Sequence, residues 1–189
     1  MTRIIAGEHR GRRLSTPKGE RTRPTSDRAR EGLFSTLQSL IDLDGARVLD
    51  LYAGSGALGL EALSRGAGEA TLVDNDPQAL RALVANVEAL QAAATVVDEE
   101  VSAFLRSDPA SYDLVVLDPP YETDVGPTLQ LLEAWLAPAA VVVVERRTRG
   151  PEPSVPEWLV PDRSRRYGEA TLWYFRAAKR AGDQTGVQG

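Results

Sequence analysis

Short apolar runs alternate with stretches of helical periodicity along most of the chain, and this alternation most limits how the chain can fold. Apolar runs long enough for one strand occupy residues 46–52, 69–76, 94–100, 113–118 and 139–145. Their cores are apolar at consecutive positions, which is typical of parallel strands that are buried on both faces. Between the runs, apolar residues recur every three or four positions, as on one face of a helix. The pattern predicts a doubly wound α/β fold with a mostly parallel sheet.

The two ends of the chain have a different pattern. Residues 3–17 form short alternating pieces that are broken by Gly7 and Gly11, which indicates a β-hairpin or an extended arm. Near the C-terminus, two further strand patterns fit an antiparallel pair and bring the predicted sheet to seven strands. We therefore expect an arm over residues 1–23, a main domain over residues 24–177 and a disordered tail over residues 178–189.

The composition excludes several classes of site. The chain has no cysteine, so disulfides, thiolate metal sites and cysteine nucleophiles are excluded. Its one histidine, His9, lies in the basic arm, which excludes zinc sites built from several imidazoles and histidine-based triads. We therefore expect no metal site. We also expect a cytoplasmic protein, because the sequence has no membrane-spanning apolar run and its first residues lack the apolar core of a signal peptide.

Positive and negative charges are segregated along the chain, although the formal net charge is −5. Residues 1–30 contain nine Lys/Arg and three Asp/Glu, and residues 146–180 contain nine and four. Residues 31–145 contain four Lys/Arg against nineteen Asp/Glu. A basic head and a basic tail around an acidic middle suggest that the ends grip a polyanion, whereas an ordinary solvated surface is the plain alternative.

The first predicted strand of the main domain runs into a glycine-rich turn. Gly54, Gly56 and Gly59 satisfy the spacing G-x-G-x-x-G, in which glycines permit a tight turn and let a ligand approach the backbone. In α/β sheets such turns lie at the carboxyl ends of the strands, where ligands bind. The spacing alone is a weak signal, and it also fits a nicotinamide dinucleotide.

Acidic residues at three successive strand ends favour a different ligand. Asp50 precedes the glycines and could attract an ammonium or sulfonium group, directly or through water. Asp74 ends the second strand, where a carboxylate can accept both hydroxyls of a ribose. Glu100 ends the third strand and could accept from an adenine amino group. Each acid alone is better explained as a helix cap or a solvated turn, but the three together at successive strand ends indicate S-adenosylmethionine.

The fourth strand ends in Asp118-Pro119-Pro120-Tyr121, a carboxylate followed by a rigid turn and an aromatic ring. An exocyclic amino group of a base is a poor nucleophile, because its lone pair is delocalised into the ring. Asp118 can accept one of its N–H groups, and a prolyl carbonyl, that of Pro119, can accept the other. Tyr121 can stack on an extruded base. These residues predict methylation of an amino group, catalysed mainly by positioning and electrostatics.

Two segments carry a resemblance to known families. Residues 118–121 are similar to the (N/D)-P-P-(Y/F) motif of amino-group methyltransferases. RIIAGEHRGRRL, followed by RPTSDRAREGLFSTL, resembles the RsmD family, which methylates N2 of a guanine in bacterial 16S rRNA, and the resemblance runs from Arg3 to about Phe175. It implies a seven-stranded, Rossmann-like class I methyltransferase fold with S-adenosylmethionine as cofactor. It also implies 16S rRNA in a small ribosomal subunit as the substrate, and we expect a monomer.

The resemblance further implies roles for individual residues. The catalytic set is Asp118, Pro119, Pro120 and Tyr121. The cofactor-binding set is Asp50, Tyr52, Gly54, Gly56, Asp74, Asn75, Glu100, Val101, Asp118 and Thr25. RNA contacts are expected from Arg10, Arg12, Arg13, Arg23 and Arg28. For Arg23 and Thr25 the plain alternative is a surface residue and a helix cap. Asp74 departs from the glutamate that is often found at the ribose position of the family.

Other functions stay open at this point. The same chemistry could act on adenine N6 in DNA or on a glutamine side chain of a protein. The glycine-rich turn could serve a nicotinamide-dependent oxidoreductase. The chain could also be an RNA-binding assembly factor without activity, although the retained Asp118 argues against that interpretation.

Overall fold

The computed structural model describes residues 2–17 and 27–178. The expected disordered tail lies outside the described residues except for Ala178. Arg23 and Thr25 also lie outside them. Within the described ranges, no helix is long and apolar enough to cross a membrane.

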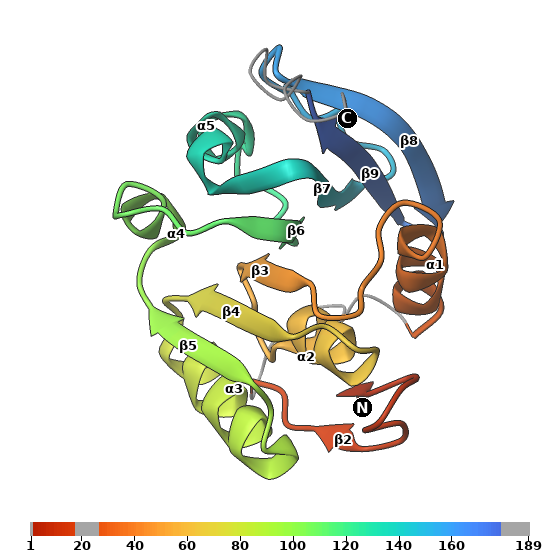
Figure 1. Cartoon of the computed structure of the whole chain (residues 1–189), viewed down its shortest axis with the longest axis vertical. Helices are drawn as coiled ribbons and strands as arrows, with labels where there is room; N and C mark the ends of the chain where they lie inside the picture. Colours follow the sequence, from red (N-terminus) through yellow and green to blue (C-terminus); the bar gives the residue numbers. More distant parts are fainter. Residues whose placement is uncertain (1, 18–26, 179–189) are drawn as a thin grey trace, which may run out of the picture.

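The large sheet confirms the predicted α/β class. Its strands lie in the order β5-β4-β3-β6-β7-β9-β8 (Figure 1). The five strands β3 to β7 are parallel, and β9 runs antiparallel to both of its neighbours, as the C-terminal pattern predicts. The strands are β3 (Arg47–Leu51), β4 (Glu69–Asp74), β5 (Ala94–Asp98), β6 (Tyr112–Leu117), β7 (Leu136–Arg147), β8 (Leu159–Tyr167) and β9 (Ala170–Ala177).

Helices cover both faces of this sheet. The first group consists of α1 (Asp27–Leu37), α2 (Ala57–Ser64) and α3 (Pro77–Leu90), and the second of α4 (Val101–Phe104), α5 (Gly126–Leu131) and the 3-10 turn η1 (Glu133–Trp135) (Figure 1). Because successive side chains of a strand point to opposite faces, Val48 packs in the first core and Leu49 in the second. Covering on both faces explains why the strands read as uninterrupted apolar runs.

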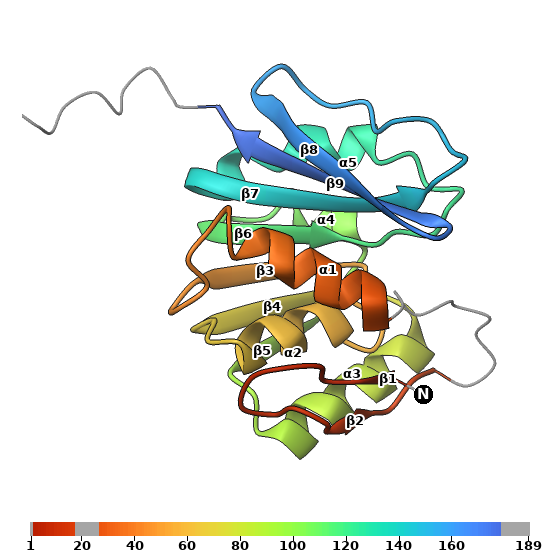
Figure 2. The same cartoon turned by 90° about the vertical axis from the view of Figure 1, so that its right-hand side faces the viewer.

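The N-terminal residues form a hairpin that packs on α2 and α3 (Figure 2). Its strands, β1 (Thr2–Arg3) and β2 (Arg13–Leu14), pair antiparallel. The carboxylate of Glu61, in α2, is 0% exposed and accepts the N–H groups of Ile5 (2.7 Å) and Ala6 (3.0 Å). It also pairs with Arg65 at 2.7 Å. A buried carboxylate with three donors is well compensated, so Glu61 fixes the hairpin to α2.

Two further polar side chains hold the hairpin. Ser64 donates to the carbonyl of Ala6 (2.6 Å) and accepts from the N–H of His9 (3.0 Å). Asn86, in α3, accepts from the N–H of Ser15 (2.7 Å) and donates to the carbonyl of the same residue (2.9 Å). The predicted arm is therefore anchored at both of its strands rather than loosely attached.

Gly7 lies where the hairpin comes closest to α2, and its replacement tests this anchoring. Its φ is +81°, and a Cβ there would lie 1.6 Å from the carbonyl oxygen of Ser64. Gly11, in the same hairpin, has φ +82° but open space around a Cβ. We expect Gly7→Ala to lower the free energy of unfolding by about 3 kcal/mol, and Gly11→Ala, which adds backbone strain alone, by about 1 kcal/mol. Urea denaturation measures both values, and equal losses would contradict the close approach.

Candidate active site

Three acidic side chains lie at or just after the carboxyl ends of neighbouring strands of the sheet. The chain passes from β3 to β4 and β5 on one side and returns to β6 and β7 on the other, so the strand order switches beside β3. A switch of this kind opens a crevice at the carboxyl ends of the strands, where α/β proteins bind ligands. The charges of Asp74 and Asp118 both act on Asp50. The fold therefore brings these three predicted site residues together.

The glycine-rich turn follows β3 and leads into α2. Tyr52, Gly54 and Gly56 have φ values of +61°, +58° and +77°. The left-handed region suits glycine but strains tyrosine, so the surrounding structure must hold Tyr52 there. A Cβ on Gly56 would lie 2.5 Å from the side chain of Leu83, whereas one on Gly54 would meet open space. The turn thus packs against the core at Gly56 and leaves its backbone approachable at Gly54.

Two of the predicted acids hold this turn in place. The N–H of Gly54 donates to Asp74 (2.8 Å), and the N–H of Gly59 donates to Asp50 (2.9 Å). The second oxygen of Asp74 accepts from the N–H of Asp76 (2.9 Å). Asp74 remains half-buried, so its oxygens keep access to a ligand, whereas Asp50 is 1% exposed.

Burial gives Asp50 an unusual titration. Loss of solvent raises its pKa to about 7, although the hydrogen bond from Gly59 acts in the opposite direction. The charges of Asp118 and Asp74 raise the pKa further, because like charges disfavour ionisation. Since Asp50 is buried, the predicted attraction of an ammonium or sulfonium group would act through its electric field rather than by direct contact.

Glu100 does not end a strand as the sequence pattern suggests. β5 ends at Asp98, and Glu100 is the N-cap of α4. Its carboxylate accepts from the N–H of Ala103 (3.0 Å) and from the hydroxyl of Ser102. The hydrogen bond from Ser102 is the main cause that lowers the pKa of Glu100. Glu100 is therefore a helix cap, which is the alternative that the sequence left open. Its exposed carboxylate also acts electrostatically on Tyr52.

Further predicted cofactor residues that the structure describes lie near the carboxyl ends of the strands. Asn75 is exposed directly after β4, and Val101 is buried at the start of α4. The hydroxyl groups of Tyr52 and Thr128, in α5, share a hydrogen bond of 3.2 Å. Burial raises the pKa of Tyr52 in spite of that bond. Thr128 was not identified from the sequence, because nothing in its local pattern shows that α5 packs against the turn.

The four-residue motif directly follows β6. Asp118 is half-buried, Pro119 is buried and Pro120 is exposed. The carbonyl of Pro120 accepts the N–H of Thr123 (2.9 Å), which closes a tight turn. Because this bond occupies the carbonyl of Pro120, the carbonyl of Pro119 is the better candidate for the prolyl acceptor that the sequence predicts.

Two arginines that were not identified from the sequence contact Tyr121. Nη2 of Arg146 donates to the backbone carbonyl of Tyr121 (2.8 Å). The guanidinium carbon of Arg147 lies 4.2 Å from the centroid of the Tyr121 ring. Both arginines are the last residues of β7. One face of the ring on which a base is expected to stack is therefore already covered.

Comparisons with known proteins identify the family. A family model described as "Conserved hypothetical protein 95" matches residues 2–176. The ribosomal RNA small subunit methyltransferase D of Escherichia coli strain K12 is 43% identical over 158 residues, which cover 82% of this chain and 79% of that protein. The protein of the same name from Haemophilus influenzae is 36% identical over 166 residues, which cover 84% of this chain and 85% of that protein. The chain belongs to the RsmD family.

The fold agrees with this assignment. A solved structure of the yhhF protein of Escherichia coli has a TM-score of 0.85 to this chain at 36% identity, and the match covers 95% of this chain and 99% of that one. Membership of the RsmD family makes the chain a class I methyltransferase with S-adenosylmethionine as methyl donor. The residues at the carboxyl ends of the strands fit that cofactor, since they offer an open backbone at Gly54, an accessible carboxylate at Asp74 and a buried carboxyl group at Asp50.

The arginines that the RsmD resemblance assigns to RNA occupy different settings. Arg10 and Arg13 are exposed on the hairpin, and Arg28 is exposed on α1. Arg12 is exposed as well, but its guanidinium donates to the carbonyl of Ala89 (2.8 Å), near the end of α3. Arg12 therefore has a structural contact. Within the part of the chain that the structure describes, the side chains of Arg10, Arg13 and Arg28 make no hydrogen bond or ion pair.

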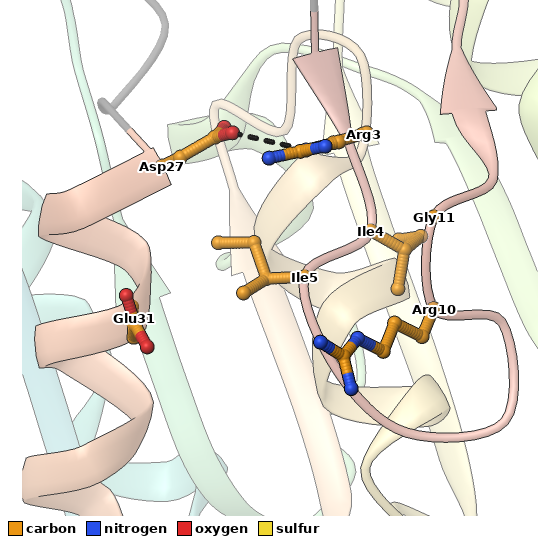
Figure 3. Close-up of a pocket in the computed structure, with 7 residues that line it drawn as sticks. All are labelled: Arg3, Ile4, Ile5, Arg10, Gly11, Asp27 and Glu31. Atoms are coloured by element: carbon orange, nitrogen blue, oxygen red, sulfur yellow. Dashed lines mark hydrogen bonds and ion pairs between the residues drawn. The ribbon is translucent and has the colours of Figure 1, made fainter.

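A cavity of about 200 Å³ lies between the hairpin and α1 (Figure 3). Arg3 and Arg10 line it from the hairpin, and Asp27 and Glu31 line it from α1. Arg3 and Asp27 form an ion pair of 3.3 Å across it. The lining mixes both charges and includes none of the acids at the strand ends. This cavity is therefore separate from the predicted cofactor residues.

The raised pKa of Asp50 predicts that stability falls with rising pH. The folded state binds the Asp50 proton more tightly than the unfolded chain does, so the free energy of unfolding falls as pH rises from about 4 to about 7. Asp50→Asn preserves the shape of the side chain and removes its titration. Between about pH 5 and about pH 8, the wild type should lose about 2 kcal/mol more stability than the variant does. Urea denaturation at both pH values measures this, and parallel profiles would contradict the raised pKa.

Proposed function

We propose that this protein transfers a methyl group from S-adenosylmethionine to the N2 amino group of a guanine in 16S rRNA. The relatives named ribosomal RNA small subunit methyltransferase D support rRNA as the substrate class. The guanine amino group follows from the RsmD resemblance of the hairpin and of residues 23–37, together with the motif at residues 118–121. In this proposal the protein acts as a cytoplasmic monomer on a small ribosomal subunit.

The position of Asp118 is the observation that carries the proposal. Asp118 follows β6 beside the switch in strand order, within electrostatic range of Asp50 at the end of the neighbouring strand. An amino group that is bound to Asp118 would therefore be held beside the crevice in which the methyl donor binds. Holding two reactants in a fixed geometry removes much of the entropic barrier to their reaction.

Asp118 and Pro119 would orient the amino group. Asp118 accepts one N–H and the carbonyl of Pro119 accepts the other, which favours a pyramidal nitrogen whose lone pair is no longer delocalised into the ring. The cofactor, when bound, supplies an electrophilic methyl group on a positively charged sulfur. As the nitrogen–methyl bond forms, the bond between the methyl group and the sulfur would break, and the nitrogen would give up one proton to Asp118, which already accepts a hydrogen bond from it. The half-buried ring of Tyr121 would stack on the extruded base.

The cofactor would be held by the glycine-rich turn and by the next two strand ends. The backbone at Gly54 and Gly56 lets the cofactor approach. Asp74 would accept the ribose hydroxyls, and Glu100 would accept from the adenine amino group while it caps α4. Asp50 would favour the cationic methionine end through its field.

The exposed arginines of the hairpin and α1 support a nucleic-acid substrate. α1 begins at the end of the sheet where β7 ends (Figure 2), and Arg28 is the second residue of α1. Arg10 and Arg13 add positive charge on the neighbouring hairpin. Contacts of this kind to phosphates give affinity without sequence selectivity, and they make binding depend on salt concentration.

Replacement of Asp118 tests the proposed chemistry. Asp118→Ala removes one acceptor of the amino group, and we expect the single-turnover rate to fall roughly 100-fold or more while the affinity for RNA changes little. Asp118→Asn keeps a carbonyl acceptor and should retain more activity than the alanine variant. Glu122→Ala is the matched control, because Glu122 is exposed in the same loop and lies outside the proposed acceptor pair.

The assay uses small ribosomal subunits that lack the modification, together with S-adenosylmethionine labelled in its methyl group. Label on N2 of one guanine of 16S rRNA is the expected result. A wild-type protein that labels no guanine of 16S rRNA would overturn the proposed substrate. Turnover near the wild-type rate in Asp118→Ala would instead overturn the role of the carboxylate.

A further inference from the structure

The end of β7 lies alongside the catalytic motif because β7 is longer than its neighbour. β6 and β7 pair in parallel as far as Leu117 and Val144, and β6 then ends. β7 continues to Arg147, so its last residues run beside the turn that follows β6. There Arg146 pairs with Thr171 of β9, and Arg147 pairs with the residue that precedes Thr171. Both arginines therefore belong to the regular backbone of the sheet.

The two arginines approach Tyr121 in different ways. Arg146 is half-buried and donates from Nη2 to the carbonyl of Tyr121 (2.8 Å), so it fixes the backbone of the motif. Arg147 is exposed and lies over the ring, with 4.2 Å between its guanidinium carbon and the ring centroid. A guanidinium at that distance is attracted by the electrons of the ring, so it restrains the plane of the ring.

The setting of Arg146 indicates a role beyond stability. Its Nη1 is buried and has no acceptor among the residues that the structure describes. Burying a donor without an acceptor is costly, so a site that served stability alone would favour another side chain. The charge of Arg146 also acts on the phenol of Tyr52, in the glycine-rich turn. Arg146 therefore contacts the catalytic motif and also acts electrostatically on the glycine-rich turn.

We propose that Arg146 and Arg147 are positioning residues for methyl transfer, which together hold Tyr121 so that one face of its ring receives the target base. This inference rests on the proposed function. Arg147 covers one face of the ring, so the base would stack on the opposite face. Arg146 fixes the carbonyl of Tyr121, and with it the position of the ring relative to Asp118. A ring held in this way does not have to be ordered when the base arrives, so the reacting geometry is reached more often.

The inference predicts an effect on the rate of reaction rather than on RNA binding. With saturating small subunits and S-adenosylmethionine, Arg147→Ala should slow single-turnover methyl transfer about tenfold, and Arg147→Lys should recover most of the loss because an ammonium group also binds an aromatic face. Arg149→Ala is the matched control. Arg149 is exposed two residues further along, and it makes no hydrogen bond or ion pair with the described part of the chain. Its removal takes away the same charge and should leave the rate unchanged.

A double-mutant cycle tests whether Arg147 acts through Tyr121. In the background of Tyr121→Ala, Arg147→Ala should cause no further loss of rate, because the ring that it restrains is absent. If the two losses instead multiply, the inference is overturned. An exposed arginine could instead contact a phosphate of the RNA, and the salt dependence of RNA binding distinguishes this role from positioning of the ring. Loss of a phosphate contact would reduce the salt slope of RNA binding by about one unit. We expect an unchanged slope, and a reduced slope with an unchanged rate would overturn the inference.

Arg146 provides the second arm of the test. Arg146→Ala should also slow the reaction, and Arg146→Lys, which keeps a donor for the Tyr121 carbonyl, should recover part of the rate. Should Arg146→Ala fail to fold, the Arg147 variants still decide the question, because Arg147 is exposed and its loss leaves the core intact. A wild-type protein that is inactive on 16S rRNA would refute the proposed function. An active wild type with full activity in Arg147→Ala would refute only the inference drawn from β7.

Discussion

Two carboxylates that accept backbone N–H groups hold the turn on which the rest of the molecule depends. Asp74 binds the N–H of Gly54, and Asp50 binds the N–H of Gly59. These bonds fix a turn that contains several left-handed residues, and the turn sets where α2 begins. α2 in turn carries Glu61 and Ser64, which anchor the N-terminal hairpin. The crevice and the basic hairpin beside it therefore share one structural origin.

The two acids that hold the turn, Asp50 and Asp74, also repel each other electrostatically. Burial raises the pKa of Asp50 to about 7, and the charges of Asp118 and Asp74 add to the shift. A cation bound at this edge would relieve the repulsion. A positively charged ligand that binds only the folded state would therefore stabilise it. This negative edge lies close to a positively charged hairpin, so the segregation of charge along the sequence has a counterpart in space.

The sequence predicted those features whose cause lies within one element. The parallel strands follow from apolar runs, and the approachable backbone follows from the glycine spacing. It failed where two distant segments meet. Glu100 was expected to end a strand, but β5 ends earlier and its side chain caps α4. Arg146 and Arg147 looked like ordinary charges of the basic tail, because only the extension of β7 past β6 brings them to Tyr121. Glu61 was not recognised as an anchor, because its partners are backbone groups more than fifty residues away.

In the proposed function, the turn after β6 positions the amino group of one guanine of 16S rRNA for methyl transfer. The most direct measurement maps methylated nucleotides on 16S rRNA from a strain that lacks this protein, from the same strain with the wild type restored, and from one with Asp118→Ala. We expect one N2-methylguanine that is missing without the protein, returns with the wild type and stays missing with the variant. Identical maps from all three strains, or a lost modification on another base, would contradict it.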